Sequence, residues 1–192
     1  MSFVIAPLSP AHISAWGELF EAAASTCFCR YWHFEGDKNA WLARSAFEPE
    51  ISRAEHAACV ERGDDDGKGL VALEGELCVG WLKLTPRASV PKLRRLPVYK
   101  KLDLGEEAGA WSIGCLLVRP DRRGEGVSRA LIAEAGAHAR AWGATSLEAY
   151  PHVQDTRTSD EQMWRGTLSA YLAAGFVEVA GERPYPVLRL AL

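Results

Sequence analysis

One short stretch of this sequence carries more structural information than any other: Val118-Arg119-Pro120-Asp121-Arg122-Arg123-Gly124-Glu125-Gly126-Val127-Ser128-Arg129. The apolar run before it, 110–118, predicts a strand buried on both faces. The segment after it, 127–142, has apolar residues at helical spacing. Two glycines let the backbone approach a ligand closely, and the free N–H groups of the helix start face the same place. The stretch therefore predicts an anion cradle, most naturally for phosphates, to which three arginines add positive charge: Arg122, Arg123 and Arg129.

Two common phosphate-binding motifs do not fit this cradle. A Walker loop needs Gly-Lys followed by Ser or Thr, and no such triplet occurs in the chain. A dinucleotide fingerprint needs a third glycine, where this sequence continues as Val127-Ser128-Arg129. Its glycine loop would also open the first strand–helix unit, whereas helical segments and a hairpin precede the cradle here. The ligand is thus expected to carry phosphates that are bound by a motif other than these two.

Outward from the cradle, strand and helix patterns alternate along the whole chain. Strands are expected at 3–8, 70–73, 77–84, 110–118, 146–149, 176–180 and 187–192. Helices are expected from Pro10 to about residue 23, and at 37–47, 51–62, 127–142 and 167–174. Glu74-Gly75-Glu76 is typical of a hairpin turn between two antiparallel strands. The order predicts an α/β fold, with one domain over residues 1–192 built around a mixed sheet.

Residues 86–103 form a basic segment of uncertain purpose. Its cations are Lys92, Arg94, Arg95, Lys100 and Lys101. Charge runs are usually solvated, so we expect a solvent-exposed loop with a short helix. The alternative is a lid that contacts an anionic ligand.

Composition excludes several classes of protein. The chain has 192 residues, 48% of them hydrophobic and 24% charged, which is typical of a globular domain rather than a disordered one. A net charge of -3 argues against a main role in nucleic-acid binding. No run is long and apolar enough to cross a membrane, and the first residues lack the features of a secretory signal. We therefore expect a cytoplasmic protein with neither nucleic acid nor membrane as a partner.

Five cysteines fit a reducing compartment and packed thiols better than disulfides or a metal site. An odd count without a secretory signal does not suggest a disulfide framework. Cys27 and Cys29 are separated by one residue only, which is poor spacing for zinc, and no second pair follows. No metal is therefore expected.

The cradle resembles the R-x-x-G-x-G/A loop of the GNAT superfamily, the Gcn5-related N-acetyltransferases. Arg123 to Ser128 carries that pattern, with Ser128 where the family usually has Gly or Ala. Downstream, Tyr171 and the Gly175-Phe176 pair resemble the family's Y-x-x-x-G-F segment. An early Cys/Trp-rich segment, Cys27 to Trp32, resembles an uncharacterised bacterial subgroup. The resemblance implies a splayed, mostly antiparallel sheet of about six or seven strands flanked by helices.

The resemblance also implies a ligand and a reaction. The ligand is acetyl-CoA as cosubstrate, held by the strand end and the cradle: Leu116, Leu117, Val118, Arg123, Gly124, Glu125, Gly126, Val127, Ser128 and Arg129. The reaction is N-acetyl transfer to a primary amine of a small molecule or peptide by direct attack. A backbone N–H near Leu116 to Val118 would stabilise the oxyanion, and Tyr171 would protonate the departing thiol.

The general base and the acceptor site are less well defined. Glu148 in a short apolar strand is the first candidate base, because a buried carboxylate must be paired or face a cavity. Glu106, Glu107, His33, His138, His152 and a strand-held water remain alternatives. Residues expected on the acceptor side are Tyr31, Trp32, Trp81, Trp111 and His152, although aromatic side chains more often pack in cores.

Two questions stay open from sequence alone. A non-catalytic acyl-CoA-binding sensor or interaction module would keep the cradle but need no acid or base. The last strand, 187–192, could finish the sheet or pair across a dimer, so the chain is expected to be a monomer or a homodimer.

Overall fold

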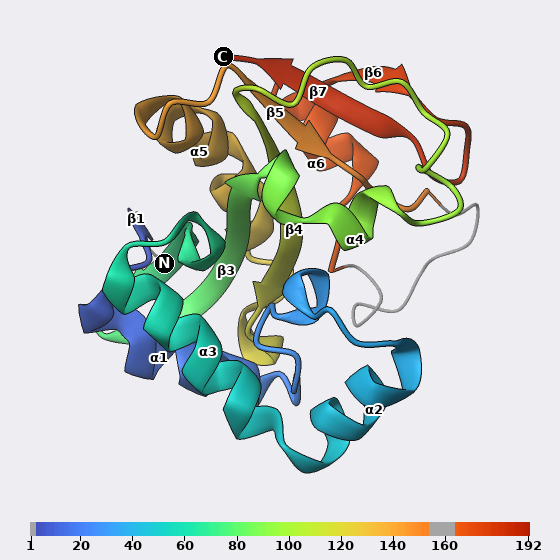
Figure 1. The fold of residues 1–192 in the computed structure, drawn as a ribbon. Helices are drawn as coiled ribbons and strands as arrows, with labels where there is room; N and C mark the ends of the chain where they lie inside the picture. Colours follow the sequence, from blue (N-terminus) through green and yellow to red (C-terminus); the bar gives the residue numbers. More distant parts are fainter. Residues whose placement is uncertain (1–2, 154–163) are drawn as a thin grey trace.

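A computed structural model describes residues 3–153 and 164–192 of the chain (Figure 1). The described residues form one seven-stranded sheet in the order β1-β2-β3-β4-β5-β7-β6. Only β4 and β5 run parallel to each other among these neighbours. The strands are β1 Val4–Pro7, β2 Gly69–Glu74, β3 Leu77–Pro86, β4 Ala110–Val118, β5 Ser146–Ala149, β6 Val177–Ala180 and β7 Val187–Ala191. The expected mixed, mostly antiparallel sheet is confirmed.

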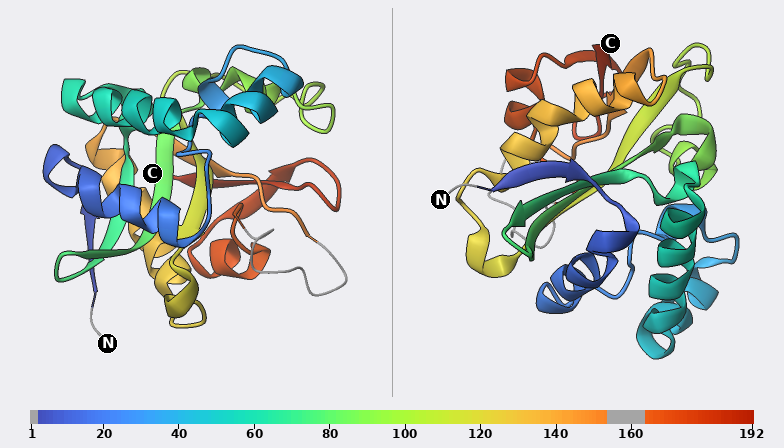
Figure 2. Two further views of the ribbon diagram at one scale, coloured as in Figure 1. Left: turned by 90° about the horizontal axis from the view of Figure 1, so that it is seen from below. Right: turned by 90° about the vertical axis from the view of Figure 1, so that its left-hand side faces the viewer.

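Helices cover both faces of this sheet. Figure 2 shows α1 and α3 on one side of the sheet and α5 and α6 on the other. The helices are α1 Ile13–Ala22, α2 Lys38–Phe47, α3 Pro49–Arg62, α4 Pro91–Arg94, α5 Val127–Ala141 and α6 Leu168–Ala173. Short 3-10 turns lie between them: η1 Pro10–His12, η2 Tyr31–His33, η3 Asp65–Gly67, η4 Arg87–Ser89 and η5 Pro120–Arg122. One hydrophobic core lies beneath each helical layer, and a third cluster gathers around Trp32 and Tyr99.

Local sequence signals explain several helix boundaries. The Asp37 side chain accepts a hydrogen bond from the Ala40 N–H at 2.8 Å and begins α2. Thr167 does the same for the Ala170 N–H at 3.2 Å and begins α6. Gly63 follows α3 with a left-handed φ of 74°, the conformation that ends many helices. The predicted strands and helices all appear, with ends shifted by a few residues.

The sheet opens between β4 and β5. Their register covers three pairs only, from Ala110 opposite Ser146 to Ser112 opposite Glu148. Beyond Ser112 the two strands diverge, as Figure 1 shows for β4 (olive) and β5 (orange). On its other edge β4 has a bulge against β3, because the register shifts at Gly114. Bulges re-aim the backbone and are frequent beside functional sites.

The basic segment 86–103 differs from expectation in part. It carries the predicted short helix, α4, and Arg95, Lys100 and Lys101 are exposed as expected. Its apolar residues Val90, Leu93 and Tyr99 are instead buried in one cluster with Trp32, Tyr150 and Val187. The expectation of a solvated loop fails for these residues because it considered only the cations and not the apolar residues between them.

The last strand lies inside the sheet. β7 pairs with β5 on one edge and with β6 on the other, so it completes the sheet of this chain. β6 is therefore the edge strand, with Val177 and Val179 exposed. Among the described residues, the helices are too short or too polar to traverse a lipid bilayer.

Candidate functional site

The predicted cradle lies at the end of β4 and the start of α5. Gly124 and Gly126 have φ angles of 81° and 84°, which favour glycine. A Cβ atom built on either glycine would meet no other atom within 4 Å, so the space beside the loop is open. Gly126 is the N-cap of the 15-residue α5 and provides no side-chain cap. The first N–H groups of α5 can therefore bind an anion.

Two of the cradle's arginines are already paired. Arg122 binds Glu74 through its Nε and Nη2 atoms, at 3.2 and 3.1 Å from the carboxylate oxygen. The Arg119 Nε lies 2.9 Å from Asp121. Arg123 and Arg129 form no ion pair with any residue of the described ranges. The positive charge that remains for an anionic ligand is thus mostly that of Arg123 and Arg129.

A three-residue segment, Trp164 to Gly166, lies against the open edge of β4. The Leu116 N–H, which no longer faces β5, donates a hydrogen bond to the Trp164 carbonyl at 2.7 Å. The Tyr171 hydroxyl donates to the Arg165 carbonyl at 2.8 Å. A Cβ on Gly166 would lie 2.8 Å from the Tyr171 hydroxyl and 2.9 Å from a Leu116 methyl, so Gly166 fills the space between them. The expected oxyanion donor and the expected acid therefore lie on two sides of one segment.

Tyr171 is held as a protonated phenol. The side chain is fully buried and packs edge-on against Phe176, with ring centroids 5.3 Å apart. Burial raises its pKa well above the ordinary value of 10. A phenol that keeps its proton can act as an acid and not as a base at neutral pH.

Glu148 has partners that favour a structural role. The carboxylate is fully buried; one oxygen accepts from Arg87 at 2.9 Å and from Arg189 at 2.6 Å. The other oxygen accepts from the Tyr150 hydroxyl at 2.6 Å. These bonds occupy both oxygens with two cations and a phenol. They favour an ion-pair role for Glu148 over proton transfer.

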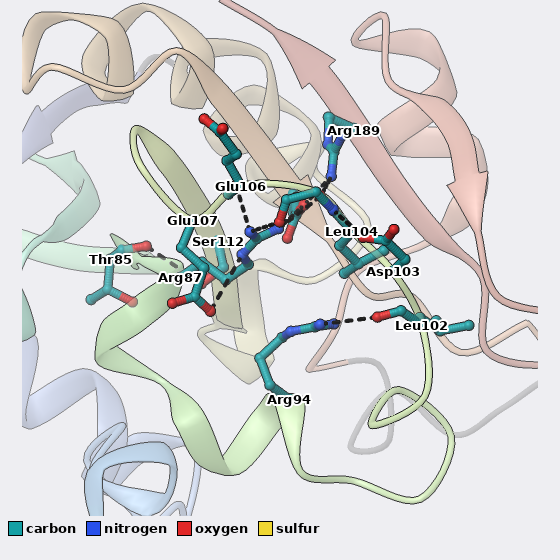
Figure 3. A network of polar contacts seen from close by, with 12 residues as sticks. Thr85, Arg87, Arg94, Leu102, Asp103, Leu104, Glu106, Glu107, Ser112 and Arg189 are labelled. Atoms are coloured by element: carbon teal, nitrogen blue, oxygen red, sulfur yellow. Dashed lines mark hydrogen bonds and ion pairs between the residues drawn. The ribbon is translucent and has the colours of Figure 1, made fainter.

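Arg87 connects this carboxylate to the chain that leads into β4. Figure 3 shows the guanidinium reaching the backbone between Leu104 and Glu106. It donates to the carbonyls of Leu104, Gly105 and Glu106 at 3.1, 2.8 and 2.6 Å. The network thus fixes the segment 104–106 to β5 and, through Arg189, to β7.

The aromatic residues expected on the acceptor side are divided between three places. Tyr31 and Trp32 lie at the bulge of β4, where the Trp32 indole N–H donates to the Gly114 carbonyl at 2.9 Å. Trp81 is instead a core residue on the α1 side, fully buried against Trp16. Trp111 packs in the other core, against Trp142 of the α5 layer. For Trp81 and Trp111, the expectation that aromatic side chains more often pack in cores is correct.

His152 contacts a different aromatic partner. Its ring stacks on Tyr185, which packs against the cluster that contains Trp32, with centroids 4.7 Å apart and an interplanar angle of 7°. The Trp164 ring lies 5.8 Å from that of Trp32. The tryptophans around the opening are therefore Trp32 and Trp164.

A buried polar group behind the bulge was not fully predicted. His33 was only one of several candidate bases, and Asp66 and Lys83 carried no prediction. The His33 Nδ1 lies 3.3 Å from the Asp66 carboxylate, and the Lys83 Nζ donates to the Asp66 carbonyl at 2.6 Å. A lysine in a strand of buried residues and a Trp-His pair close after two cysteines were the available signals, but neither indicates which partners meet in space.

The cysteines are free thiols in the described structure. Cys29 accepts a hydrogen bond from the Trp81 indole at 3.0 Å, and burial raises its pKa well above 9. A hydrogen bond to Cys29 and burial raise the pKa of Cys27 as well. No group of three or more His, Cys, Asp and Glu side chains is arranged to hold a metal ion within residues 3–153 and 164–192.

Comparisons with known proteins agree with this architecture. Coenzyme A-bound PaiA N-acetyltransferase from Thermoplasma acidophilum has a TM-score of 0.57 at 16% identity, with all of both chains covered. The putative acetyltransferase yncA from Salmonella typhimurium, with acetyl-CoA, has a TM-score of 0.57 at 16% identity and covers 100% of this chain and 95% of its own. A GNAT family acetyltransferase from Brucella melitensis with acetyl-CoA has a TM-score of 0.53 at 22% identity, over 100% and 88%.

Sequence comparison supports the same grouping. No curated protein sequence matches the chain. The family profile described as "Acetyltransferase (GNAT) family" matches residues 18–165, which is more than half of the chain and includes the opening, β4 and the cradle. The chain therefore belongs to the GNAT acetyltransferase family.

Proposed function

We propose that this protein is an acetyl-CoA-dependent N-acetyltransferase that transfers an acetyl group to a primary amine of a small molecule or peptide by direct attack. One observation supports this more than any other. The glycine cradle, with two arginines that form no ion pair within residues 3–153 and 164–192, stands at the end of the strand that β5 leaves at the opening of the sheet. Structures of this fold with coenzyme A or acetyl-CoA bound agree with that ligand.

The residues present fit such a ligand. The open space at Gly124 and Gly126 leaves room for a pyrophosphate against the α5 N-terminus, with Glu125, Val127 and Ser128 supplying backbone N–H groups. Arg123 and Arg129 supply positive charge. The backbone edge of Leu116 to Val118, which β5 does not pair, is suited to the amide-rich arm of coenzyme A once the Trp164 carbonyl gives up the Leu116 N–H.

The proposed reaction uses two groups of this chain on either side of the Trp164–Gly166 segment. Acetyl-CoA supplies an activated thioester. The Leu116 N–H would donate to the carbonyl oxygen as negative charge develops there. Tyr171, protonated at neutral pH, would donate its proton to the departing sulfur. Both groups now donate to carbonyls of Trp164 and Arg165, so the oxygen and the sulfur of the thioester must replace these carbonyls as their acceptors.

The alternative is a non-catalytic sensor of acyl-CoA on the same fold. One observation favours it: the Leu116 N–H and the Tyr171 hydroxyl are satisfied within the protein. Such a module would bind coenzyme A without promoting acetyl transfer.

The first experiment tests the cradle. Gly126→Val adds a β-branched side chain at a φ of 84° and should weaken coenzyme A binding at least ~10-fold, because the loop must change shape. Gly143→Val is the matched control at the opposite end of α5, with a φ of 92° and the same open surroundings. Isothermal titration calorimetry with coenzyme A measures both. Unchanged affinity in Gly126→Val, with the protein folded, would contradict the cradle assignment.

The second experiment tests catalysis. Thiol release from acetyl-CoA is followed against a panel of primary amines for wild type, Tyr171→Phe and Tyr150→Phe. Loss of a general acid should lower kcat by ~10²-fold or more in Tyr171→Phe. Tyr150→Phe removes a hydroxyl of similar burial and should retain turnover. Coenzyme A binding without release by any amine favours the sensor.

A further inference from the structure

His33 and Asp66 form an oriented pair behind the bulge of β4. The Asp66 carboxylate lies 3.3 Å from the His33 Nδ1, so a neutral imidazole donates from Nδ1 and leaves Nε2 as a bare acceptor. The His33 side chain is 3% exposed, and its Nε2 has no hydrogen-bond partner among residues 3–153 and 164–192. An unpaired buried nitrogen is unfavourable and calls for a partner from outside the described protein.

The surroundings keep His33 neutral. Burial lowers its pKa below 6.5, and the cations of Lys83 and Arg30 act in the same direction, while Asp66 opposes them. His56 of α3 is buried nearby and interacts electrostatically with His33. The charged and titratable groups that face the ring are therefore Asp66, Lys83, Arg30 and His56. Asp66 is ionised, since its contact with His33 lowers its pKa to about 2.

Two contacts place this pair beside the proposed acyl site. Trp32, the residue before His33, donates to the Gly114 carbonyl at 2.9 Å, two residues before Leu116. Lys83, which binds the Asp66 carbonyl, stands opposite Cys115 on the neighbouring strand. The neighbours of the pair thus meet β4 at Gly114 and Cys115, within two residues of the N–H that would bind the thioester oxygen.

We infer that His33, oriented by Asp66, is the general base that takes the proton from the acceptor amine. The inference rests on the proposed function and adds the residue that the acid and the oxyanion donor require. As the amine nitrogen bonds to the acyl carbon, its proton passes to the His33 Nε2, directly or through one water. The carbon–sulfur bond then breaks, and the sulfur takes the Tyr171 proton.

Other candidates fit this role less well. Glu148 accepts three hydrogen bonds, two of them from arginines. β4 itself carries no carboxylate or imidazole between Ala110 and Val118. His56 is enclosed by Trp16 and Trp81, with ring centroids at 4.4 and 5.6 Å. His33 alone among these combines a carboxylate on one nitrogen with proximity to the bulge.

The first test reads the imidazole directly and needs no acceptor. Nitrogen-15 NMR of the full chain should show His33 with the proton on Nδ1 at pH 7.5 and a pKa below 6.5. Asp66→Asn should lower that pKa further, because the carboxylate that favours the imidazolium is lost. A proton on the Nε2 of the wild-type protein at pH 7.5 would overturn the inference.

The second test is kinetic and uses acetyl-CoA with the amine panel described above. His33→Gln should lower kcat/KM ~10²-fold or more and remove the acidic limb of its pH profile, and added imidazole should restore part of the rate. His56→Gln, the matched buried control, should keep both the rate and the limb. An unchanged profile in His33→Gln would contradict the base assignment while leaving acetyl transfer intact. Wild-type failure with every amine would contradict the proposed function instead, and the NMR experiment would still test His33.

Discussion

At the scale of single residues, Glu148 shows how a buried charge can be misread. A carboxylate in an apolar strand must be paired, and here Arg87, Arg189 and Tyr150 provide the partners. Two of these lie 61 and 41 residues away in sequence, and neither is predictable without the fold. Glycines are different: their conformational signal is local, so Gly124 and Gly126 were predicted at the positions where the loop needs them.

Glu148→Gln should reduce stability without a specific catalytic defect. The change leaves the buried Arg87 and the partly exposed Arg189 without their shared counter-charge, so we expect a loss of about 3 kcal/mol in the free energy of unfolding. Urea denaturation measures it. Glu178→Gln, which removes the partner of Arg183 in an exposed pair, should cost under about 0.5 kcal/mol. A Glu148→Gln protein of normal stability that lacks turnover would identify the carboxylate as a base after all.

At the scale of elements, β4 and α5 were predictable because each carries its pattern of apolar residues over at least nine positions. The burial of the 86–103 segment was not, since its apolar residues pack against η2, β7 and Tyr150, which follows β5, rather than against neighbours in sequence. The Trp164–Gly166 segment was unpredictable for a related reason. Its backbone carbonyls, which no sequence pattern records, accept from the two groups that the site needs.

Gly166→Ala should strengthen coenzyme A binding. The added methyl group stands at a φ of 73° and less than 3 Å from Tyr171 and Leu116, so it disfavours the docked state, in which the Trp164–Gly166 segment lies against β4. The carbonyls of this docked segment compete with the ligand for the same donors, and weakening them favours the ligand. A penalty of about 1 kcal/mol for the docked state would tighten binding by about 5-fold. Calorimetry compares it with Gly175→Ala, at the far end of α6, where the added Cβ meets only Leu190 at 3.6 Å. Weaker binding in Gly166→Ala would show that the docked segment is itself part of the binding surface.

At the scale of the whole molecule, buried histidines make the free energy of unfolding depend on pH. His56 is fully buried, and burial holds its pKa well below 6.5. His33 is shifted in the same direction. Below pH 6.5 the unfolded chain binds more protons than the folded one, so the free energy of unfolding falls as the pH falls.

His56→Gln should flatten this acid response. One histidine that stays neutral in the folded state lowers the free energy of unfolding by about 1.4 kcal/mol when the pH falls from 7.5 to 5.5. Urea denaturation at the two pH values gives the pH-dependent change in the free energy of unfolding for each protein. Subtracting the variant's change from that of wild type removes the contribution of all groups that the two proteins share. An equal loss in both proteins would mean that His56 is protonated in the fold.

The interior place of β7 has a consequence for synthesis. A ribosome makes Val187–Ala191 after the other six strands of the described sheet, yet the strand order β5-β7-β6 puts it between two strands made earlier. Until it emerges, the nascent chain presents an unpaired β5 edge, and Glu148 lacks the Arg189 half of its counter-charge. The N-terminal half can fold as it leaves the ribosome, whereas the β5–β7–β6 half must close in one late step. Conditions that slow the synthesis of this segment prolong the life of an intermediate with an unpaired β5 edge.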